Sequence, residues 1–594
     1  MCGIAGCITT KKSASKAHVE SMLEALKHRG PDSSGRVYAM VDHVKFGMTR
    51  LAIIDVKTGQ QPFYSEDGKI AIVANGEIYN YQELKKKLKR KHRFVSKSDI
   101  EIILHLYEEV GLDVFKLLKG MFAIAIYDKR LDKLILARDR WGEKPLYYSI
   151  ANRSLYFSSE LKSLLKIKKI DRDLNLDAIN TYFHYYYIPE WQTAFKNVYK
   201  LDAGSYAVIN AKDLKIKIKR YWNPSKELLK RKNLKEKIRK AFIKACERTM
   251  LADVPVGLTL SGGFDSAAVA AALAPKYASK LTTFTVGYEG LSPTDERYHA
   301  KKLADHFGMK NVSLELKDKD VLESFPAVVI AQDDPIADIA AAGVDAVSKL
   351  AHKHGMKVLI NGAGGDELFW GYLWVRKSLQ SDVSKKNKKP VFGKSATAFT
   401  KTKQFTSKLF SKTFKSKLDN KNISPKLFSN SVSQISRYYM DRIRDMWLQP
   451  DVLVIGDRMG MRHAIETRSP LVDADLTDLL ITTEQSVMAW KKGHKYWMRK
   501  ALSNRVPKFV FNKKKQGFTP PVGRWLLKIL WRYMYLLDND CFLVKYKILD
   551  KNKLKLARIF WIFLPIYWYQ YYQLLVLEIW GRHYVMGQKI SDFK

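Results

Sequence analysis

The sequence predicts a two-domain α/β fold, and three features of the chain predict it. With 594 residues, the chain exceeds the roughly 250–300 residues at which single hydrophobic cores stop growing. Its first part carries β-type segments, such as residues 69–74 and 122–127, which are typical of a strand-rich layered domain. After residue 258, buried strands alternate with helices, as they do around a parallel sheet with ligands at the carboxyl ends of its strands.

The composition is that of an ordinary globular protein. Hydrophobic residues make up 46% of the chain, which is usual for such proteins. The four cysteines form no C-x-x-C pair, which argues against a disulfide framework or a zinc site. The N-terminus has no basic leader and only a short apolar run, so we predict no signal peptide and expect a cytoplasmic protein.

A net charge of +43 is compatible with binding to nucleic acid or to an anionic membrane. The lysines are spread along the chain, for example at 85–91, 166–169 and 513–515. No zinc-finger spacing, RNA-recognition motif or basic zipper accompanies them. A lysine bias on solvated faces is the favoured interpretation, and we expect no specific nucleic-acid partner.

Residues 559–580 are long and apolar enough to suggest a membrane span, which needs about 20 residues. However, Pro565, Gln570, Gln573 and Glu578 interrupt the stretch, and tyrosines and tryptophans fill its middle. We therefore expect a buried or partner-facing helix here, and we do not expect contact with a membrane.

Cys2 follows the initiator methionine, and its small side chain permits removal of Met1. The mature chain would then begin with a thiol beside a free α-amine. Such an amine has a pKa near ~8, so its neutral form can take the thiol proton, and one residue supplies both nucleophile and base. A cysteine at this position is weak evidence of catalysis when taken alone.

A series of polar motifs strengthens this interpretation. They are residues 28–32 (HRGPD), 49–55 (TRLAIID), 75–80 (NGEIYN) and 98–99 (SD). With Cys2, their order and spacing resemble the class II glutamine amidotransferase domain. The resemblance covers about the first 200 residues and implies an Ntn-type αββα sandwich. We place this domain at residues 2–212, followed by a basic linker at 213–235.

By this resemblance, Cys2 attacks the glutamine side-chain amide, while Asn75 and Gly76 supply the donors that hold the oxyanion. Arg50 pairs with the substrate α-carboxylate, and two acids accept from its α-ammonium group. Without the family, the charged residues could be surface charges, and Asn75-Gly76 could be a hairpin turn. In full, the predicted glutamine site comprises Arg50, Leu51, Ala52, Ile53, Ile54, Asn75, Gly76 and the two acids Glu77 and Asp99.

The stretch 258–273 (LTLSGGFDSAAVAAAL) predicts a buried strand, a glycine-rich turn and an alanine-rich helix. Gly262 and Gly263 lack the Cβ atoms that would keep a ligand from the backbone. The N–H groups of the turn and the positive end of the helix form an anion site. Ser261 and Ser266 add hydroxyl donors, and Asp265 adds a carboxylate for Mg²⁺. An ordinary strand-to-helix turn is the alternative.

A second buried strand ends in a glycine-rich acidic turn at 358–369 (VLINGAGGDELF). In the same sheet as the first turn, Asp366 would lie near Asp265, and the two carboxylates could share a Mg²⁺ ion. A loop with solvated acids is the alternative for this turn taken alone.

Both turns resemble the ATP-pyrophosphatase (adenine nucleotide alpha hydrolase-like) fold, which splits ATP into AMP and PPi to activate a carboxylate. With residues 457–473 and 492–502, they make nearly the whole chain resemble the glutamine-hydrolysing asparagine synthetase family. The synthetase domain would span 236–594 with a helical extension, and Lys495 would stabilise charge on the activated carboxylate. The predicted ATP-binding residues are Thr259, Ser261, Gly262, Gly263, Asp265, Ser266, Val286, Asn361 and Gly362, and the predicted Mg²⁺ ligands are Asp265 and Asp366.

Two regions depart from the family pattern or stand outside it. Asparagine synthetases usually carry a glutamate, tied to formation of the aspartyl-adenylate, where this chain has Ala363. Glu367 is the nearest acid that could take over its part. Residues 376–421 are rich in lysine, serine and threonine, and we expect a poorly ordered basic insertion there.

The sequence thus predicts an enzyme that converts L-aspartate, L-glutamine and ATP into L-asparagine, L-glutamate, AMP and PPi. The reaction would pass through an acyl-adenylate and internally channelled ammonia. These small molecules are the expected partners, and homodimer formation is left open.

Three alternatives remain. The acceptor could be a carboxylate of a cell-surface sugar precursor, which Ala363 makes credible. The chain could be another class II amidotransferase that delivers ammonia to a sugar phosphate, against which the loop at 261–266 argues. It could also be an inactive basic protein that binds nucleic acid or membrane, against which the intact Cys2 and Arg50 argue.

Overall fold

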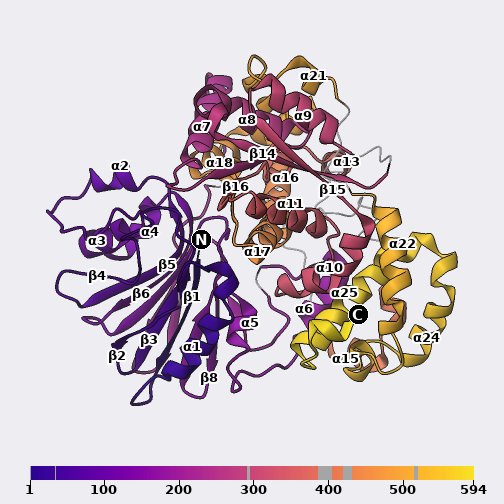
Figure 1. The fold of residues 1–594 in the computed structure, drawn as a ribbon, viewed down its shortest axis with the longest axis horizontal. Helices are drawn as coiled ribbons and strands as arrows, with labels where there is room; N and C mark the ends of the chain where they lie inside the picture. Colours follow the sequence, from indigo (N-terminus) through magenta and orange to yellow (C-terminus); the bar gives the residue numbers. More distant parts are fainter. Residues whose placement is uncertain are drawn as a thin grey trace.

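The computed structural model describes residues 2–33, 35–190, 192–225, 227–290, 295–384, 405–418, 431–513 and 520–593. A strand-rich N-terminal domain lies beside a C-terminal domain that is built on a parallel sheet and continues into a group of helices (Figure 1). The predicted two-domain α/β class is confirmed.

The N-terminal domain is a stack of two antiparallel six-stranded sheets. Its strands are β1 (Cys2–Thr9), β2 (Val37–Val41), β3 (Val44–Arg50), β4 (Phe63–Tyr64), β5 (Ile70–Ile78), β6 (Gly120–Asp128), β7 (Lys133–Arg138), β8 (Tyr147–Ala151), β9 (Ser154–Ser158), β10 (Tyr199–Lys200), β11 (Ser205–Asn210) and β12 (Ile216–Arg220). The strand orders are β10-β8-β9-β1-β3-β2 and β12-β11-β7-β6-β5-β4.

The core between these sheets comes from the alternation of side chains along each strand. Ile4 and Phe46 of the first sheet pack against Val73 and Leu136 of the second. Helices cover the outer faces, which completes the predicted αββα sandwich. These helices are α1 (Lys16–Glu24) and α5 (Leu161–Leu164) on one side, and α2 (Tyr81–Lys85), α3 (Glu101–Val110) and α4 (Val114–Leu117) on the other.

The N-terminal sheet takes in part of the range that we expected to be a linker. Residues 216–220 form β12, which pairs with β11 from Ser205↔Arg220 to Ile209↔Ile216. The alternation of isoleucine with lysine in this strand suits a sheet edge, where charged side chains discourage further pairing. Its basic composition had suggested a linker, whereas its period of two indicates a strand.

The C-terminal domain is organised around a five-stranded parallel sheet of order β15-β14-β13-β16-β17. The strands are β13 (Val256–Thr259), β14 (Thr282–Tyr288), β15 (Lys310–Leu316), β16 (Val358–Ile360) and β17 (Glu466–Arg468). Helices α7 (Leu234–Arg248), α8 (Phe264–Tyr277) and α9 (Arg297–His306) lie above this sheet in Figure 1, and α11 (Ala341–Lys353) and α17 (Val454–Arg462) lie below it. The predicted strand, turn and helix around 258–273 are therefore present.

Further helices complete this domain and its extension. They are α6 (Leu176–Tyr185), α10 (Asp318–Ala331), α12 (Gly365–Leu368), α13 (Leu373–Ser384), α15 (Lys412–Lys417), α16 (Val432–Ile443), α18 (Ala474–Ile481), α19 (Glu484–Val487), α20 (Tyr496–Ala501), α21 (Lys508–Phe511), α22 (Val522–Tyr533), α23 (Phe542–Lys545), α24 (Lys551–Phe560) and α25 (Trp568–Tyr584). Helix α6 precedes the predicted linker, yet it packs against the C-terminal extension. The hydroxyl of Tyr182 on α6 donates to the carbonyl of Gln573 on α25 at 2.7 Å.

The expected basic insertion at 376–421 is helical at both of its described ends. Helix α13 runs to Ser384 and buries Leu379, while α15 buries Phe414. These apolar side chains pack although lysine and serine surround them in the sequence. Residues 385–404 and 419–421 of the insertion lie outside the described part of the chain.

The apolar stretch 559–580 is not a single helix. Helix α24 ends at Phe560, two 3-10 turns follow at Trp561–Phe563 and Pro565–Tyr567, and α25 begins at Trp568. Every residue of α25 from 570 to 581 is buried, as expected, but much of the preceding segment is exposed. Within the described residues, no helix has the length and apolar character to cross a membrane.

The packing of α25 generates a stability prediction at Gly581. A Cβ atom there would lie 2.1 Å from Cδ1 of the buried Phe542 ring. We expect Gly581→Ala to lower the melting temperature, because overpacking a core costs roughly 1–3 kcal/mol. In the control Gly523→Ala on α22, the new Cβ meets nothing within 4 Å. Thermal unfolding followed by circular dichroism should separate the two variants, and equal melting temperatures would contradict the packing.

Candidate active sites

The two sheets of the N-terminal domain bring the predicted nucleophile beside its predicted partners. Cys2 begins β1, and the pairing of β1 with β3 sets it opposite Arg50. The backbone N–H of Cys2 donates to Asn75 Oδ1 on β5 at 2.9 Å. The Cys2 side chain is buried, and this burial raises the pKa of its thiol. A thiol in such a place needs a neighbouring base to become nucleophilic.

Asn75 and Gly76 lie within strand β5, so they do not form a hairpin turn. Gly76 has φ +151°, and a Cβ on it would lie 2.0 Å from the carbonyl oxygen of Met121 on β6. Only glycine fits this conformation and this spacing. The side-chain nitrogen of Asn75 is buried and has no hydrogen-bond partner among the described residues. It is thus a donor held ready near Cys2, as an oxyanion site requires.

Carbonyl groups hold the Arg50 guanidinium in place. It donates to the carbonyls of Ile54, Asp55 and Val56 at 3.1, 2.7 and 3.2 Å. The structure shows no ion pair between Arg50 and a carboxylate in the described part of the chain. The positive charge is therefore fixed in position and can attract an anionic group of a ligand.

The two predicted ammonium acceptors, Glu77 and Asp99, are buried acids. Asp99 Oδ2 accepts from the N–H of Ile78 at 2.6 Å. Burial raises the pKa of Asp99 to about 6. Burial, followed by the charges of Asp99 and Glu466, raises the pKa of Glu77 well above its usual value. Both carboxylates would be stabilised by a cation, which is what an α-ammonium group provides.

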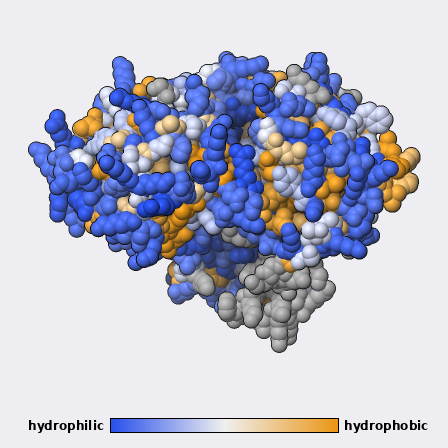
Figure 2. Space-filling view, turned by 90° about the horizontal axis from the view of Figure 1, so that it is seen from below, coloured by the Kyte–Doolittle hydropathy of each residue, from blue (hydrophilic) through white to orange (hydrophobic). Residues whose placement is uncertain are grey.

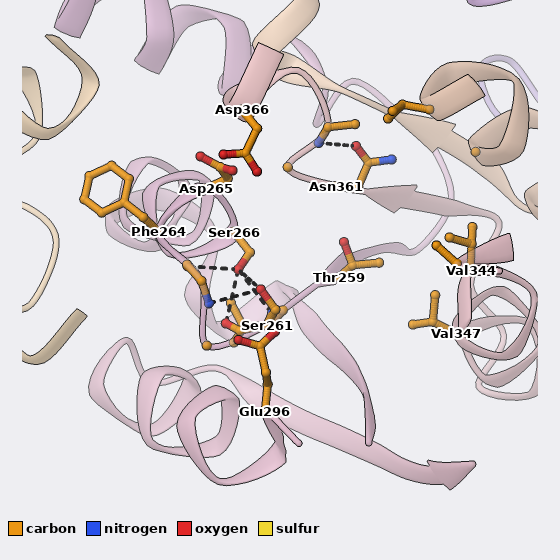
Figure 3. A pocket seen from close by; sticks show the side chains of 18 of the residues that line it. Thr259, Ser261, Phe264, Asp265, Ser266, Glu296, Val344, Val347, Asn361 and Asp366 are labelled. Carbon is orange, nitrogen blue, oxygen red and sulfur yellow. Dashed lines mark hydrogen bonds between the residues drawn. The ribbon is translucent and has the colours of Figure 1, made fainter. Parts of the chain in front are cut away.

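In the C-terminal domain, hydroxyl groups organise the glycine-rich loop between β13 and α8 (Figure 3). Ser261 Oγ and Ser266 Oγ lie 2.9 Å apart, and Ser261 Oγ accepts from the N–H of Gly263 at 3.1 Å. The loop leads directly into the N-terminus of the 14-residue helix α8. Its backbone and hydroxyl donors, together with the positive end of the helix, suit a phosphate.

The second glycine-rich turn, between β16 and α12, approaches this loop closely. A Cβ on Gly365 would lie 2.4 Å from Cγ of Asp265, so a side chain at 365 would displace the carboxylate. The turn brings Asp366 next to Asp265, as Figure 3 shows. The Lys495 ammonium pairs with both acids, at 2.8 Å from Asp366 Oδ1.

Lys495 lies on neither turn but just before α20, and it is only 4% exposed. Burial alone would lower the pKa of its ammonium, but Asp265 and Asp366 raise it above the usual value. Lys495 therefore stays charged, and its ammonium group forms ion pairs with both carboxylates. Carboxylate oxygens are the donors that Mg²⁺ prefers, so this pair fits a magnesium ion that accompanies a nucleotide.

A cavity of about 500 Å³ connects these groups. Val286, Val344 and Val347 make one side of it apolar, while Asp265, Asp366 and Lys495 make another side charged. All predicted ATP-site residues line it, together with Ala363 and Glu367: Thr259, Ser261, Gly262, Gly263, Asp265, Ser266, Val286, Asn361, Gly362, Asp366 and Lys495. The cavity therefore brings together residues that lie more than 230 positions apart in the sequence, such as Thr259 and Lys495.

Glu367 faces this cavity from α12. Its Oε1 accepts from the hydroxyl of Tyr372 at 2.8 Å. Burial, followed by the charge of Asp366, raises the pKa of Glu367 to about 7. Asp338, which also lines the cavity, shares a hydrogen bond with the buried Asp451, and burial raises the pKa of both acids. The sequence pattern gave no sign of this carboxyl pair.

Arg468 lies in the stretch 457–473 that resembles the family, but the sequence did not indicate a functional role for it. It is fully buried on β17 and donates to Glu466 Oε1 at 2.7 Å, and its Nη2 lies 3.6 Å from Glu77 Oε1. The carbonyl of Arg468 accepts from the N–H of Asn361 at 2.9 Å. One residue therefore touches the predicted glutamine site and the nucleotide cavity.

Arg29 lies in the motif at 28–32, but the sequence did not indicate a functional role for it either. Its Nε donates to the carbonyl of Cys2 at 3.1 Å, and its Nη1 donates to Glu160 and Asp457 at 2.7 and 2.8 Å. Asp457 belongs to α17 of the C-terminal domain. The backbone of the predicted nucleophile is thus tied across the domain interface.

The position of Lys495 generates a prediction. Lys495→Met should lower ATP-dependent PPi release by roughly 10²-fold or more, on the scale of one lost donor to developing charge. Lys491→Met, at an exposed position on the neighbouring turn, is the matched control. PPi release is measured with ammonium as the nitrogen source, and thermal unfolding verifies that both variants fold. Equal rates for the two variants would exclude a role for Lys495 in the cavity.

Comparison with known proteins agrees with this arrangement. A family model described as a glutamine amidotransferase domain matches residues 1–222, and one described as asparagine synthase matches residues 237–557. The chain is 33% identical over 565 residues to an asparagine synthetase (glutamine-hydrolyzing) of Bacillus subtilis, covering 89% of this chain and 88% of that one. It is 35% identical over 408 residues to a putative asparagine synthetase of Methanocaldococcus jannaschii, covering 65% of this chain and 78% of that one.

More distant proteins are also similar. An amidase of Gibberella zeae is 27% identical over 85% of both chains. A solved glutamine PRPP amidotransferase of Bacillus subtilis has 16% identity, covers 52% of this chain and 65% of its own, and has a TM-score of 0.28, which is too low to support an argument. From the two family models and the first relatives, the chain belongs to the glutamine-hydrolysing asparagine synthetase family, and it is a ligase that uses glutamine and ATP to form an amide.

Proposed function

We propose that the N-terminal domain hydrolyses glutamine through a thioester on Cys2. After removal of Met1, the α-amine of Cys2 would take the thiol proton, and the thiolate sulfur would bond to the side-chain carbonyl carbon of glutamine. The buried donor of Asn75 and the N–H of Gly76 would hold the resulting oxyanion. As this intermediate collapses, the protonated α-amine of Cys2 returns the proton to the departing nitrogen, which leaves as ammonia. Water then adds to the thioester carbonyl, releases glutamate and restores the thiol.

Recognition of the glutamine backbone follows from the charges that surround Cys2. Arg50, held by three carbonyls, would pair with the α-carboxylate. Glu77 and Asp99, whose pKa values are raised by burial, would share the α-ammonium group. A zwitterionic amino acid supplies both an anionic group for Arg50 and a cationic group for the two acids, whereas a neutral amide supplies neither.

In the C-terminal domain, we propose that the cavity binds ATP and activates a carboxylate. The loop at 261–266 would hold the phosphates, and the apolar side with Val286 would hold the adenine. Asp265 and Asp366 would hold a Mg²⁺ ion, which neutralises phosphate charge when bound. Lys495 would stabilise the charge that builds up as the acceptor oxygen attacks the α-phosphorus and PPi leaves.

We propose L-aspartate as the acceptor, adenylated on its side chain and then attacked by ammonia from the first site. The observation that carries this proposal is the single cavity in which the phosphate loop, Lys495 and Glu367 meet. Above pH about 7, the ionised Glu367 offers a carboxylate to the acceptor's α-ammonium group. It would thereby take over the part that the family resemblance assigns to a glutamate at position 363. A cytoplasmic location stays a prediction from the sequence, and homodimer formation stays open.

A second acceptor class has one specific observation in its favour. Ala363 lines the cavity with the smallest side chain that carries a Cβ, which leaves space there. A larger acceptor, such as the carboxylate of a cell-surface sugar precursor, could occupy that space. The chemistry would be the same, with only the acceptor changed.

Cys2→Ala should abolish amide formation with glutamine and leave the activity with added ammonium intact. The reason is that Cys2 serves only the hydrolysing site, whereas the adenylating cavity has its own residues. Cys246→Ala, at a buried cysteine on α7, is the control and should retain both activities. The measurement is amide production with each nitrogen source, and parallel loss of both in Cys2→Ala would exclude two separate sites.

The acceptor is tested by aspartate-dependent ATP–PPi exchange in the wild type, Glu367→Gln and Ala363→Glu. With aspartate as acceptor, wild-type exchange should rise with pH through about 7, because Glu367, whose pKa is about 7, is protonated below that pH and ionised above it. Glu367→Gln should depress exchange sharply and remove this rise, while Ala363→Glu should be tolerated or raise activity.

A larger sugar carboxylate gives the opposite pattern. Glutamate at 363 should then block the acceptor by bulk and by like charge. An absence of exchange with aspartate in all three proteins would rule out asparagine synthesis and leave the sugar carboxylate as the acceptor class.

A further inference from the structure

The C-terminal extension exposes a concentrated group of apolar side chains. Phe563 is 76% exposed, Leu556 is 60% exposed and Ile559 is 59% exposed. Together with Phe560, Ile562 and Ile566, they occupy α24 and the two turns that follow it; we call these six residues the C-terminal apolar patch. Figure 2 shows apolar surface at its right-hand edge, the side on which α24 lies in Figure 1.

Helix α24 carries several large apolar side chains on its exposed face, which is unusual for a helix that only packs against a core. Leu554 is 1% exposed and marks the inward side. With about 100° between successive residues, Leu556, Ile559 and Phe560 point roughly opposite to Leu554. A surface helix normally directs polar groups outward, so this outward stripe indicates a surface that meets an apolar phase.

Basic residues border the patch. Lys551, Lys553 and Lys555 are exposed on the same helix, and Arg558 is half-buried. Between residues 551 and 567 the chain has four basic and no acidic residues. An apolar stripe flanked by lysines is typical of helices that lie in the plane of a membrane surface.

Aromatic side chains extend the patch onto a second helix. Trp531 on α22 is 70% exposed, and its ring centroid lies 6.3 Å from that of Trp561. Tryptophan and phenylalanine with nearby lysines suit the boundary between lipid headgroups and acyl chains. A second copy of this chain is disfavoured as the occupant, because each copy carries a net charge of +43 and like charges repel.

We propose that the C-terminal apolar patch and its bordering lysines dock this enzyme peripherally onto an anionic lipid bilayer. The apolar residues enter the headgroup boundary while Lys551, Lys553 and Lys555 contact lipid phosphates. The proposal concerns a surface contact and not a membrane span. Contact between residues 559–580 and a membrane was not expected from the sequence, and the proposal departs from that expectation because Ile559, Phe560, Ile562, Phe563 and Ile566 are exposed.

Vesicle co-sedimentation of the full-length protein tests this. One vesicle preparation is phosphatidylcholine alone, and the other is an equal mixture of phosphatidylcholine and phosphatidylglycerol. We expect binding to the mixture only, weakened by salt because exposed charges are screened. Each lysine near an anionic leaflet strengthens binding by roughly five-fold, so the triple variant Lys551→Gln, Lys553→Gln, Lys555→Gln should weaken it by up to about a hundred-fold. The double variant Phe560→Ser, Phe563→Ser should weaken it by about ten-fold or more.

Matched controls lie in the N-terminal domain. The triple variant Lys86→Gln, Lys87→Gln, Lys91→Gln removes three exposed lysines, and Val95→Ser, Leu131→Ser removes two exposed apolar side chains. Both should bind like the wild type, and thermal unfolding verifies that all variants fold.

Three results would overturn the proposal. They are absence of binding to the anionic vesicles, equal weakening by patch and control variants, or a lipid-independent dimer that Phe560→Ser, Phe563→Ser dissociates. The last result would assign the patch to a second copy of the chain.

Discussion

Buried charge at the domain interface is the constraint on which both sites depend. Arg29 is fully buried and is neutralised by Glu160 and Asp457, which belong to different domains. Removing one partner of such a group leaves an uncompensated buried charge, which costs roughly 3–5 kcal/mol. Because Arg29 also donates to the carbonyl of Cys2, the position of this predicted nucleophile is set partly by the neighbouring domain. The predicted glutamine site therefore depends on a contact that crosses the domain interface.

Strand β17 connects the predicted glutamine site with the predicted ATP cavity. Arg468 on this strand balances Glu77 on one side, while its carbonyl holds the N–H of Asn361 on the other. Ser469 Oγ also donates to Asn361 Oδ1 at 2.8 Å. An ammonium group bound at Glu77 would change the electrostatic balance at Arg468. Arg468 and Asn361 are hydrogen-bonded neighbours, and Thr467, which precedes Arg468 on β17, lines the predicted ATP cavity.

Local patterns could be predicted from the sequence, but long-range contacts could be predicted only where the family resemblance or the order of strands in the sheet supplied them. The loop at 261–266 and the turn at 362–366 follow from strand, glycine and helix patterns within a few residues, and the structure places them in one cavity. By contrast, the roles of Arg29 and Arg468 depend on contacts between domains, and the pair of Asp338 and Asp451 joins a loop to a helix more than a hundred residues away. Basic composition suggested a linker where β12 forms a sheet edge. For 559–567, hydropathy left a buried and a partner-facing helix open, and the structure shows exposed apolar side chains there.

Burial of carboxyl groups unites the two sites and bears on the acceptor. Glu77 and Asp99 in one domain, and Glu367 in the other, all have pKa values raised chiefly by burial. A buried acid of this kind gains most from a cationic ligand, because the cation offsets the cost of keeping the carboxylate charged. Glutamine would bring an α-ammonium group to the first predicted site, and aspartate would bring one to the second. A sugar carboxylate without an amino group would leave Glu367 uncompensated. The open space at Ala363 favours a large acceptor by shape, whereas the carboxylate of Glu367, once ionised above pH about 7, favours an acceptor with an amino group.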